Sequence, residues 1–375
     1  MIYSRRLYLA AVIFIFTAAF VCANGITQLP SDAGQAYYVS AEGNDANNGF
    51  SEQQAFKTLN KAVTSASAGG IKRIVVIGTL DSKSEANYKD DDSVFSINNS
   101  GDIEIIIIGK DEANQAKLLG GDGKRVVNIT GKSRIRFENI FITGGVTEKK
   151  GGGIYANNGA VIVLAVNAVL SGNKASDGGG IYALDSDITI LDNAVIDQNE
   201  AEKQGGGVSL NKSSLIVRGE AVISGNTGSV DGGGIYAYES YVVLDDNAVL
   251  EGNISECGGG FCIEHFSSAV VRGEVIVKGN KSWGPQGGGG LCAGVFSNIH
   301  MTGGIVTDNA SSNGGGVYLG GAVFTFSRGS ITDNAAKKGG GIYSGIGSAL
   351  YIEDDSFVDD NFPDDIFEYD NVFDY

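Results

Sequence analysis

Basic residues, proline and histidine are scarce in this sequence. Its 375 residues include 27 Lys and Arg against 44 Asp and Glu, with 3 Pro and 2 His. The formal charge of −17 argues against a protein that binds nucleic acid or an anionic membrane surface, because both functions need basic patches. The lack of proline beside 57 Gly excludes a collagen-like chain and a proline-rich disordered one. The glycines must therefore serve another kind of structure.

Long apolar runs are absent too, except near the N-terminus. Arg5 and Arg6 precede an apolar run of 15 residues, 7–21, which is short for a membrane span. A small-residue cleavage site follows around Cys22. We therefore predict a signal peptide over residues 1–23, no integral membrane segment in the mature chain, and a secreted or cell-surface protein. The periplasm and the outer-membrane exterior both stay open as locations, and lipidation of Cys22 is the alternative to simple cleavage.

Two markers recur with one period along the chain. Gly-Gly-Gly triplets begin at Gly151, Gly178, Gly205, Gly232, Gly258, Gly288, Gly314 and Gly339. Asparagines recur in phase at Asn173, Asn199, Asn226, Asn253, Asn280, Asn309, Asn334 and Asn361. The steps in both series are 25 to 30 residues, which is the signature of a stacked repeat array.

One repeat, Gly178 to Asn199, indicates how the units must stack. Short β-rich pieces alternate, and one face collects Ile181, Ile188, Ile190, Ala194 and Ile196. A single coil cannot bury that face alone, so successive coils must stack and pair their strands in parallel. The sequence thus predicts an all-β fold, a single-stranded parallel β-helix of about 12 coils of about 27 residues.

We interpret both markers as structural. Three glycines in a row let the chain turn into a strand without Cβ clashes between coils. A phosphate-binding loop would need a following helix, and none is predicted after any triplet. The asparagines are expected to hydrogen-bond along the stack, rather than to bind a metal or a glycan.

The two ends depart from the repeat. Ser51 and Gln54 form a predicted capping box for a helix, whose apolar face would cap the first coil with Phe56, Leu59, Ala62 and Val63. Strands are predicted at 73–78 and 103–109, and the segment 132–145 leads into the regular array. At the other end, acidic and aromatic residues dominate. We expect a cap whose aromatic rings cover the last core layer, with a secretion or anchoring tail as the alternative.

These features divide the chain into five parts. We predict a signal peptide (1–23), a polar lead (24–36), an N-terminal cap with irregular coils (37–150), regular repeats (151–361) and an acidic aromatic cap or tail (362–375). No cofactor is expected, although the clustered C-terminal carboxylates leave a Ca²⁺ site open.

Two stretches carry a family resemblance. YYVSAEGNDANNGFSEQQAFKTLNKAV, from Tyr37, is similar to the opening of many bacterial secreted right-handed β-helix proteins of the pectate-lyase-like superfamily. Repeats such as LSGNKASDGGGIYA resemble those of polymorphic outer-membrane proteins and related adhesins. The resemblance covers about residues 37–361. It implies a right-handed helix and a non-catalytic, adhesin-like or scaffold role at the cell surface.

The pectate-lyase-like resemblance also raises an enzymatic alternative, a polysaccharide lyase or glycoside hydrolase. Neither His265 nor His300 lies in a Gly-His-Gly motif, and the Asp245-Asp246 pair falls in a turn of one coil. We therefore assign no catalytic residue.

Candidate binding residues are aromatic. The position after each inward aliphatic should face outward, and tyrosine fills it at Tyr155, Tyr182, Tyr236, Tyr318 and Tyr343. Such a strip could stack on an extracellular glycan or a protein partner, or it could be a stabilising ladder without a ligand. The irregular region 253–310 adds Trp283 and His265 as candidates. We expect a monomer.

The cysteines allow three arrangements. Cys262 and Cys292 occupy equivalent positions in successive coils, and stacked Cα atoms about 4.8 Å apart suit a disulfide. Two reduced thiols, or a pairing that involves Cys257, are the alternatives.

Overall fold

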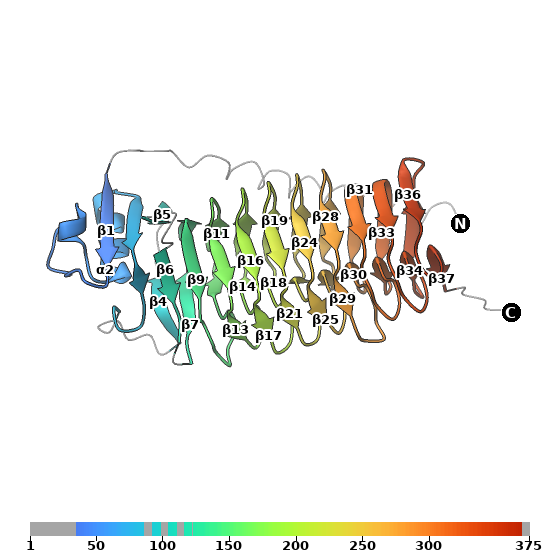
Figure 1. Ribbon diagram of the computed structural model, residues 1–375, viewed down its shortest axis with the longest axis horizontal. Helices are drawn as coiled ribbons and strands as arrows, with labels where there is room; N and C mark the ends of the chain where they lie inside the picture. Colours follow the sequence, from blue (N-terminus) through green and yellow to red (C-terminus); the bar gives the residue numbers. More distant parts are fainter. Residues whose placement is uncertain (1–34, 86–91, 99–103, 111–115, 122, 370–375) are drawn as a thin grey trace. The chain divides into compact units, whose positions relative to one another are not determined.

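A computed structural model describes residues 35–85, 92–98, 104–110, 116–121 and 123–369. From Ala36 onward they belong to one compact unit, a parallel β-solenoid (Figure 1). The predicted signal peptide, the Cys22 alternative and nearly all of the polar lead lie outside the described residues.

One regular turn is built from four short strands. They are β14 (Ile181–Leu184), β15 (Asp187–Ile190), β16 (Val195–Asp197) and β17 (Glu200–Ala201). Each pairs in parallel with its counterpart one coil away, without a register shift. This is the stacking that the alternating pattern predicts.

The strands form four ladders. The first contains β1 (Ala36–Ser40), β2 (Arg73–Ile77), β5 (Glu104–Gly109), β8 (Arg134–Glu138), β11 (Val161–Leu164), β15, β19 (Ser214–Val217), β23 (Tyr241–Leu244), β27 (Ser268–Val271), β31 (Asn298–Thr307), β33 (Val323–Thr332) and β35 (Ala349–Ile352). The second contains β3 (Thr79–Leu80), β6 (Ala116–Leu119), β9 (Ile140–Thr143), β12 (Val169–Ser171), β16, β20 (Val222–Ser224), β24 (Val249–Glu251), β28 (Ile276–Lys278) and β36 (Ser356–Asp359). The long strands β31 and β33 join these two ladders into one sheet.

The other two ladders are separate sheets. The third contains β4 (Ser93–Asn98), β7 (Arg125–Thr130), β10 (Ile154–Asn157), β14, β18 (Val208–Asn211), β22 (Ile235–Tyr238), β26 (Phe261–Glu264), β30 (Leu291–Ala293), β32 (Val317–Leu319), β34 (Ile342–Ser344) and β37 (Ile366–Glu368). The fourth contains β13 (Lys174–Ala175), β17, β21 (Thr227–Gly228), β25 (Ile254–Ser255) and β29 (Lys281–Ser282).

The repeat length is regular over most of the described chain. Strands of the first ladder from β5 to β35 start 25 to 30 residues apart, whereas β2 starts 37 residues after β1. The fold is therefore confirmed as an all-β parallel solenoid of about 10 turns of about 27 residues, and the described residues contain a single short α-helix, near the start of the solenoid.

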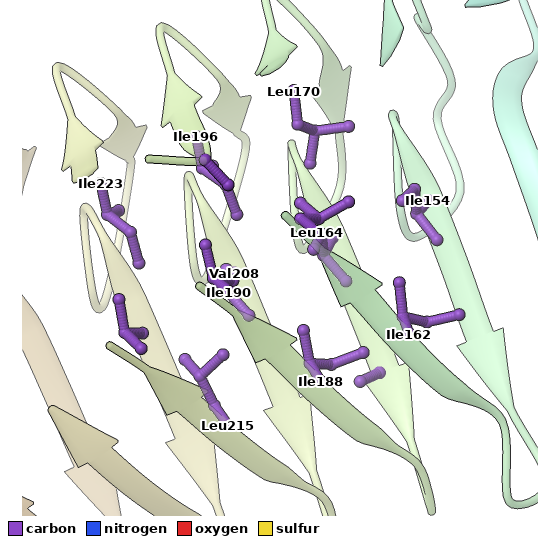
Figure 2. Packing of buried hydrophobic residues seen from close by; sticks show 14 of the residues in the cluster. Ile154, Ile162, Leu164, Leu170, Ile188, Ile190, Ile196, Val208, Leu215 and Ile223 are labelled. Atoms are coloured by element: carbon purple, nitrogen blue, oxygen red, sulfur yellow. The ribbon is translucent and has the colours of Figure 1, made fainter. Parts of the chain in front are cut away.

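The core is a stack of identical aliphatic positions. Figure 2 shows Ile162, Ile188 and Leu215 in one column, one residue per coil, and all three are buried. The inward residues predicted for the repeat Gly178 to Asn199 are each at most 1% exposed. The period-2 pattern thus identifies the core directly.

The asparagine column is a continuous buried hydrogen-bond ladder, as predicted. The Asn226 backbone N–H and side-chain Nδ2 both donate to Oδ1 of Asn253, each at 3.0 Å. Asn226 Nδ2 also donates to the Ile196 carbonyl of the preceding coil at 3.0 Å. Each asparagine therefore joins three coils. At the C-terminal end, Asn361 donates instead to Oδ1 of Asp365, at 3.1 Å from its backbone N–H and 3.0 Å from Nδ2.

The three glycines of a triplet are needed for different reasons. The first has φ between 58° and 80° in all eight triplets. A Cβ on the second, such as Gly233, would lie 2.5 Å from the carbonyl oxygens of Gly259 and Ile254. A Cβ on the third, Gly234, would lie 2.6 Å from the carbonyl oxygen of Gly260 in the next coil. Glycine is therefore required by backbone conformation once and by close packing between coils twice.

A serine ladder was not foreseen. Ser186, Ser213 and Ser240 each donate a backbone N–H to the hydroxyl of the serine one coil further, and the last acceptor is Ser267. These serines recur every 27 residues, so the signal was present in the sequence.

The N-terminal cap differs from prediction in its boundaries. Helix α2 (Leu59–Gly69) packs against β1 and β2, the first two strands of the first ladder, and against β4, the first strand of the third ladder. Its N-cap is Thr58, whose hydroxyl accepts from Lys61 N. The predicted capping box at Ser51 is wrong, since Ser51 precedes only the one-turn 3₁₀ helix η1 (Glu52–Gln54) and makes no side-chain cap bond. The predicted apolar face is buried, although Phe56 precedes the helix.

Glu85 gives the cap a dependence on pH. Its carboxylate accepts from Leu59 N and Asn60 Nδ2, but burial raises its pKa from 4.5 to about 7. Between these two values the folded protein holds a proton that the unfolded chain has lost. The contribution of Glu85 to the free energy of unfolding is therefore full below pH 4.5 and is lost as pH rises through about 7. We expect Glu85→Gln to flatten the fall in the urea unfolding midpoint across this window. The exposed Glu42→Gln serves as control, and an unchanged slope in Glu85→Gln would contradict the assignment.

The C-terminal aromatics do not cover the last core layer in the described chain. Phe357, Phe362 and Tyr369 are exposed, while Phe367 stacks on Tyr343 with ring centroids 5.1 Å apart. Phe373 and Tyr375 lie outside the described residues.

Deleting one complete coil tests the additivity of the stack. Removing Gly178 to Gln204 would bring β10 next to β18, which carries the same inward pattern. Because each coil contacts only its neighbours, we expect a folded chain with an undiminished far-UV β-sheet spectrum per residue. Global unfolding of this variant would contradict independent stacking.

Candidate functional site

The turn that leaves the third sheet changes length within the irregular region. Two residues separate β14 from β15, β18 from β19 and β22 from β23, but three separate β26 from β27. The turn between β30 and β31 contains the same extra residue, because the register pairs Ile263 with Ala293 and Ser268 with Asn298. The extra residue is therefore in phase in two successive coils. In both coils the added residue is phenylalanine, Phe266 and then Phe296.

These phenylalanines form an exposed aromatic ridge, which we define as His265, Phe266, Val295 and Phe296. Phe266 is 69% exposed and Phe296 65% exposed, and their rings stack with centroids 5.2 Å apart and an interplanar angle of 9°. Both have left-handed backbone conformations, with φ of 61° and 60°. This conformation is uncommon for bulky residues, so the turn holds two aromatic rings in solvent at a conformational cost.

The two other candidates from this region lie at different places. His265 belongs to the ridge, and its ring packs on Tyr238 with centroids 4.9 Å apart. Trp283 directly follows β29, at the turn that enters the third sheet, and is also exposed. Sequence reasoning missed Phe266 and Phe296. The signal was the single inserted residue before the serines of the serine column.

The tyrosine column is enclosed at two of its positions. It faces away from the core, but Tyr182 is 4% exposed and Tyr236 5% exposed. Lys150 Nζ lies 4.4 Å from the Tyr182 ring centroid, and Tyr236 packs against the buried cysteines. Tyr155 and Tyr182 stack at 5.7 Å, and the guanidinium of Arg125 lies 4.8 Å from the Tyr155 ring centroid. The ring faces are thus occupied by neighbours. The enclosure of Tyr182 and Tyr236 favours the stabilising ladder over the binding strip.

Tyr318 and Tyr343, further along the column, also stack on each other, at 5.3 Å. Burial raises the pKa of Tyr318 to about 12. Lys150 Nζ donates to the Tyr182 hydroxyl at 2.9 Å. The column therefore behaves as a ladder of mutually packed rings.

The three thiols of the irregular region converge. Cys262 on β26 and Cys292 on β30 are direct register partners, as the repeat predicts. Cys257, just before a glycine triplet, places its sulfur 3.0 Å from that of Cys292. All three cysteines are buried, and none of them forms a disulfide in the structure. The structure thus brings Cys257 into a site where sequence reasoning had favoured a pair.

The repeat can now be compared with known proteins. Residues 220–238, which contain Asn226 and the triplet at Gly232, match the Chlamydia polymorphic membrane protein repeat. This is a β-helix protein with polymorphic-membrane-protein-like repeats. No curated protein matches the chain. Within the described part of the chain, no helix has the length and apolarity needed to span a membrane.

The polymorphic-membrane-protein-like repeats also form a polar groove of about 430 Å³. The groove runs along the residues that directly precede the column asparagines from Asn199 to Asn309. Its lining includes Asp197, Glu251, Lys278 and Asp308. Lys278 Nζ lies 2.8 Å from Glu251 Oε2. Sequence reasoning missed this groove, although the asparagine period indicates its positions.

The residues considered for the enzymatic alternative have other partners within these repeats. Arg272 Nη2 lies 2.6 Å from Asp245 Oδ2, and Asp246 accepts from Gly219 N at 3.1 Å. His300 lies on β31, where burial lowers its pKa, whereas His265 lies in the ridge. The site residues therefore do not gather around these groups.

Proposed function

We propose that this chain is a surface-exposed, adhesin-like protein that binds a protein partner through the aromatic ridge. The repeat similarity supports the class, because the matching repeat is that of a membrane protein family. The stacked, solvent-exposed pair Phe266 and Phe296 is the observation that supports the contact site.

Two properties of the ridge favour a protein over a glycan. Aromatic residues are enriched in the buried centres of protein interfaces, where they become the main contributors to affinity. Sugar recognition uses free ring faces together with polar groups, whereas Phe266 and Phe296 cover one face of each other and adjoin the exposed Val295. The ridge also projects from a rigid stack, which reduces the ordering cost of binding.

Adhesion of coated beads tests the proposal. Beads carrying the protein should bind cultured epithelial cells above the level of uncoated beads, and protease treatment of the cells should remove this binding. A Phe266→Ser/Phe296→Ser double variant should lose at least tenfold in bound beads, because truncating central aromatic anchors typically costs about 2 kcal/mol or more.

Trp283→Ser is the matched control, since it removes an exposed aromatic that lies off the ridge. Its beads should bind like those of the unmodified protein. Absence of cell binding by the unmodified protein would refute the adhesin-like role. Binding that survives the double variant, or that resists protease but not glycosidase treatment of the cells, would refute the ridge as a protein-binding site.

A further inference from the structure

A second, buried constellation lies on the outer side of the third sheet, apart from the ridge. The sulfur atoms of Cys257, Cys262 and Cys292 all lie within 4.8 Å of one another. The three side chains are at most 5% exposed, and Tyr236 packs against them in one small apolar cluster. Three thiols from two adjacent coils thus share one enclosed space.

Two carboxylates adjoin the thiols. Oxygen atoms of Asp231 and Glu264 lie within 4.8 Å of each other and of the Cys262 sulfur. Gln204 Nε2 donates to Asp231 at 3.1 Å, and the Tyr236 hydroxyl donates to Glu264 at 3.1 Å. Asp231 also forms a parallel bridge with Cys257, so the fold itself holds this carboxylate beside the thiols.

The site collects five groups that can become anions, but little positive charge. Among the described residues, the basic group within ion-pairing distance of either carboxylate is the exposed His265, whose Nδ1 is 4.0 Å from Glu264 Oε2. A buried site with these properties is deficient in a cation.

The donor set identifies the class of cation. Thiolates select soft or borderline metals, and three sulfurs with one carboxylate oxygen complete the tetrahedral coordination of Zn²⁺. Sulfurs that share one Zn²⁺ at about 2.3 Å lie about 3.8 Å apart. The sulfurs here lie from 3.0 Å up to at most 4.8 Å apart, so small side-chain rotations suffice.

We propose that Cys257, Cys262 and Cys292 bind one Zn²⁺ ion, with Asp231 as the fourth ligand. Glu264 stays hydrogen-bonded to Tyr236 and borders the site. The ion joins consecutive coils where the triplet spacing lengthens from 26 to 30 residues, at the loop that contains Trp283. A disulfide is the competing arrangement, and it would leave the third thiol and both carboxylates without a cation.

Cobalt substitution tests this site independently of the adhesin-like role. The reduced full-length protein, carrying Cys22→Ala so that three thiols remain, is titrated with Co²⁺. We expect one equivalent to bind, with a thiolate-to-cobalt charge-transfer band and the strong visible bands of tetrahedral coordination. Zn²⁺ should displace the cobalt, and metal analysis after dialysis should find one zinc per chain.

Variants identify the ligands. Cys262→Ser should abolish the charge-transfer band or weaken binding at least a hundredfold, and Asp231→Asn should weaken binding about tenfold or more. Glu251→Gln, a carboxylate in the distant polar groove, should leave the titration unchanged. Because a core cysteine variant can lose its fold, the cobalt spectrum of the unmodified chain is the primary readout. No cobalt uptake by the folded, reduced protein, or a disulfide among these cysteines in protein isolated from its producing cells, would overturn the proposal.

Discussion

Replacing Gly233 by alanine is expected to destabilise the solenoid by about 3 kcal/mol or more. The added Cβ would lie 2.5 Å from backbone atoms of both Gly259 and Ile254, in the neighbouring coil. Backbone in a parallel ladder cannot move aside without breaking its own hydrogen bonds, so the overlap forces two coils apart. Urea unfolding followed by far-UV circular dichroism measures the loss.

Gly225→Ala is the comparison variant, because it adds a methyl group without steric overlap. Gly225 has φ of 59°, but its nearest neighbour would be Gln198 Cγ at 4.0 Å. This substitution therefore carries only the strain of a left-handed residue, about 1–2 kcal/mol. A loss in Gly233→Ala no larger than that in Gly225→Ala would mean that the overlap at Gly233 is relieved at little cost, which would contradict the close-packing requirement.

Asn226→Ala is expected to cost about 3 kcal/mol. The side chain accepts from the backbone N–H and from Nδ2 of Asn199, both at 3.0 Å, and donates to the Ile196 carbonyl. Alanine leaves several buried polar groups of three coils without partners, at a position that is 0% exposed.

The exposed Asn247, in a turn of the next coil, provides the comparison. Asn247→Ala should change the unfolding free energy by no more than about 0.5 kcal/mol. If Asn226→Ala also changed the free energy of unfolding by only a few tenths of a kcal/mol, the asparagine ladder would not be a source of stability.

The repeat made most of the fold predictable from sequence. Positions such as Ile188 and Asn226 recur once per coil, so one period fixes both their burial and their neighbours. The N-terminal cap was harder. Thr58, not Ser51, is the N-cap of the helix, and its backbone N–H donates to Oδ1 of Asp45 at 2.9 Å. The two residues are 13 apart in sequence, so no local motif contains this contact.

The candidate sites depend on departures from the period, which explains why they were only partly foreseen. Cys262 and Cys292 could be paired because they keep the register. Cys257 lies in a connecting loop, whose path the repeat does not specify. Phe266 is a single inserted residue, and its exposure depends on a turn conformation that neither hydrophobic pattern nor charge encodes.

The asparagine ladder has a direction, and this bears on how the solenoid grows. Each column asparagine from Asn173 to Asn334 donates its backbone N–H to the asparagine of the next coil toward the C-terminus, so a coil has a satisfied donor only after the next coil has docked. A chain that folds coil by coil from its N-terminal end therefore presents, on its last folded coil, an unpaired asparagine N–H to which the following coil can bind. Propagation continues in this way until Asp365 supplies a carboxylate oxygen in place of a further amide.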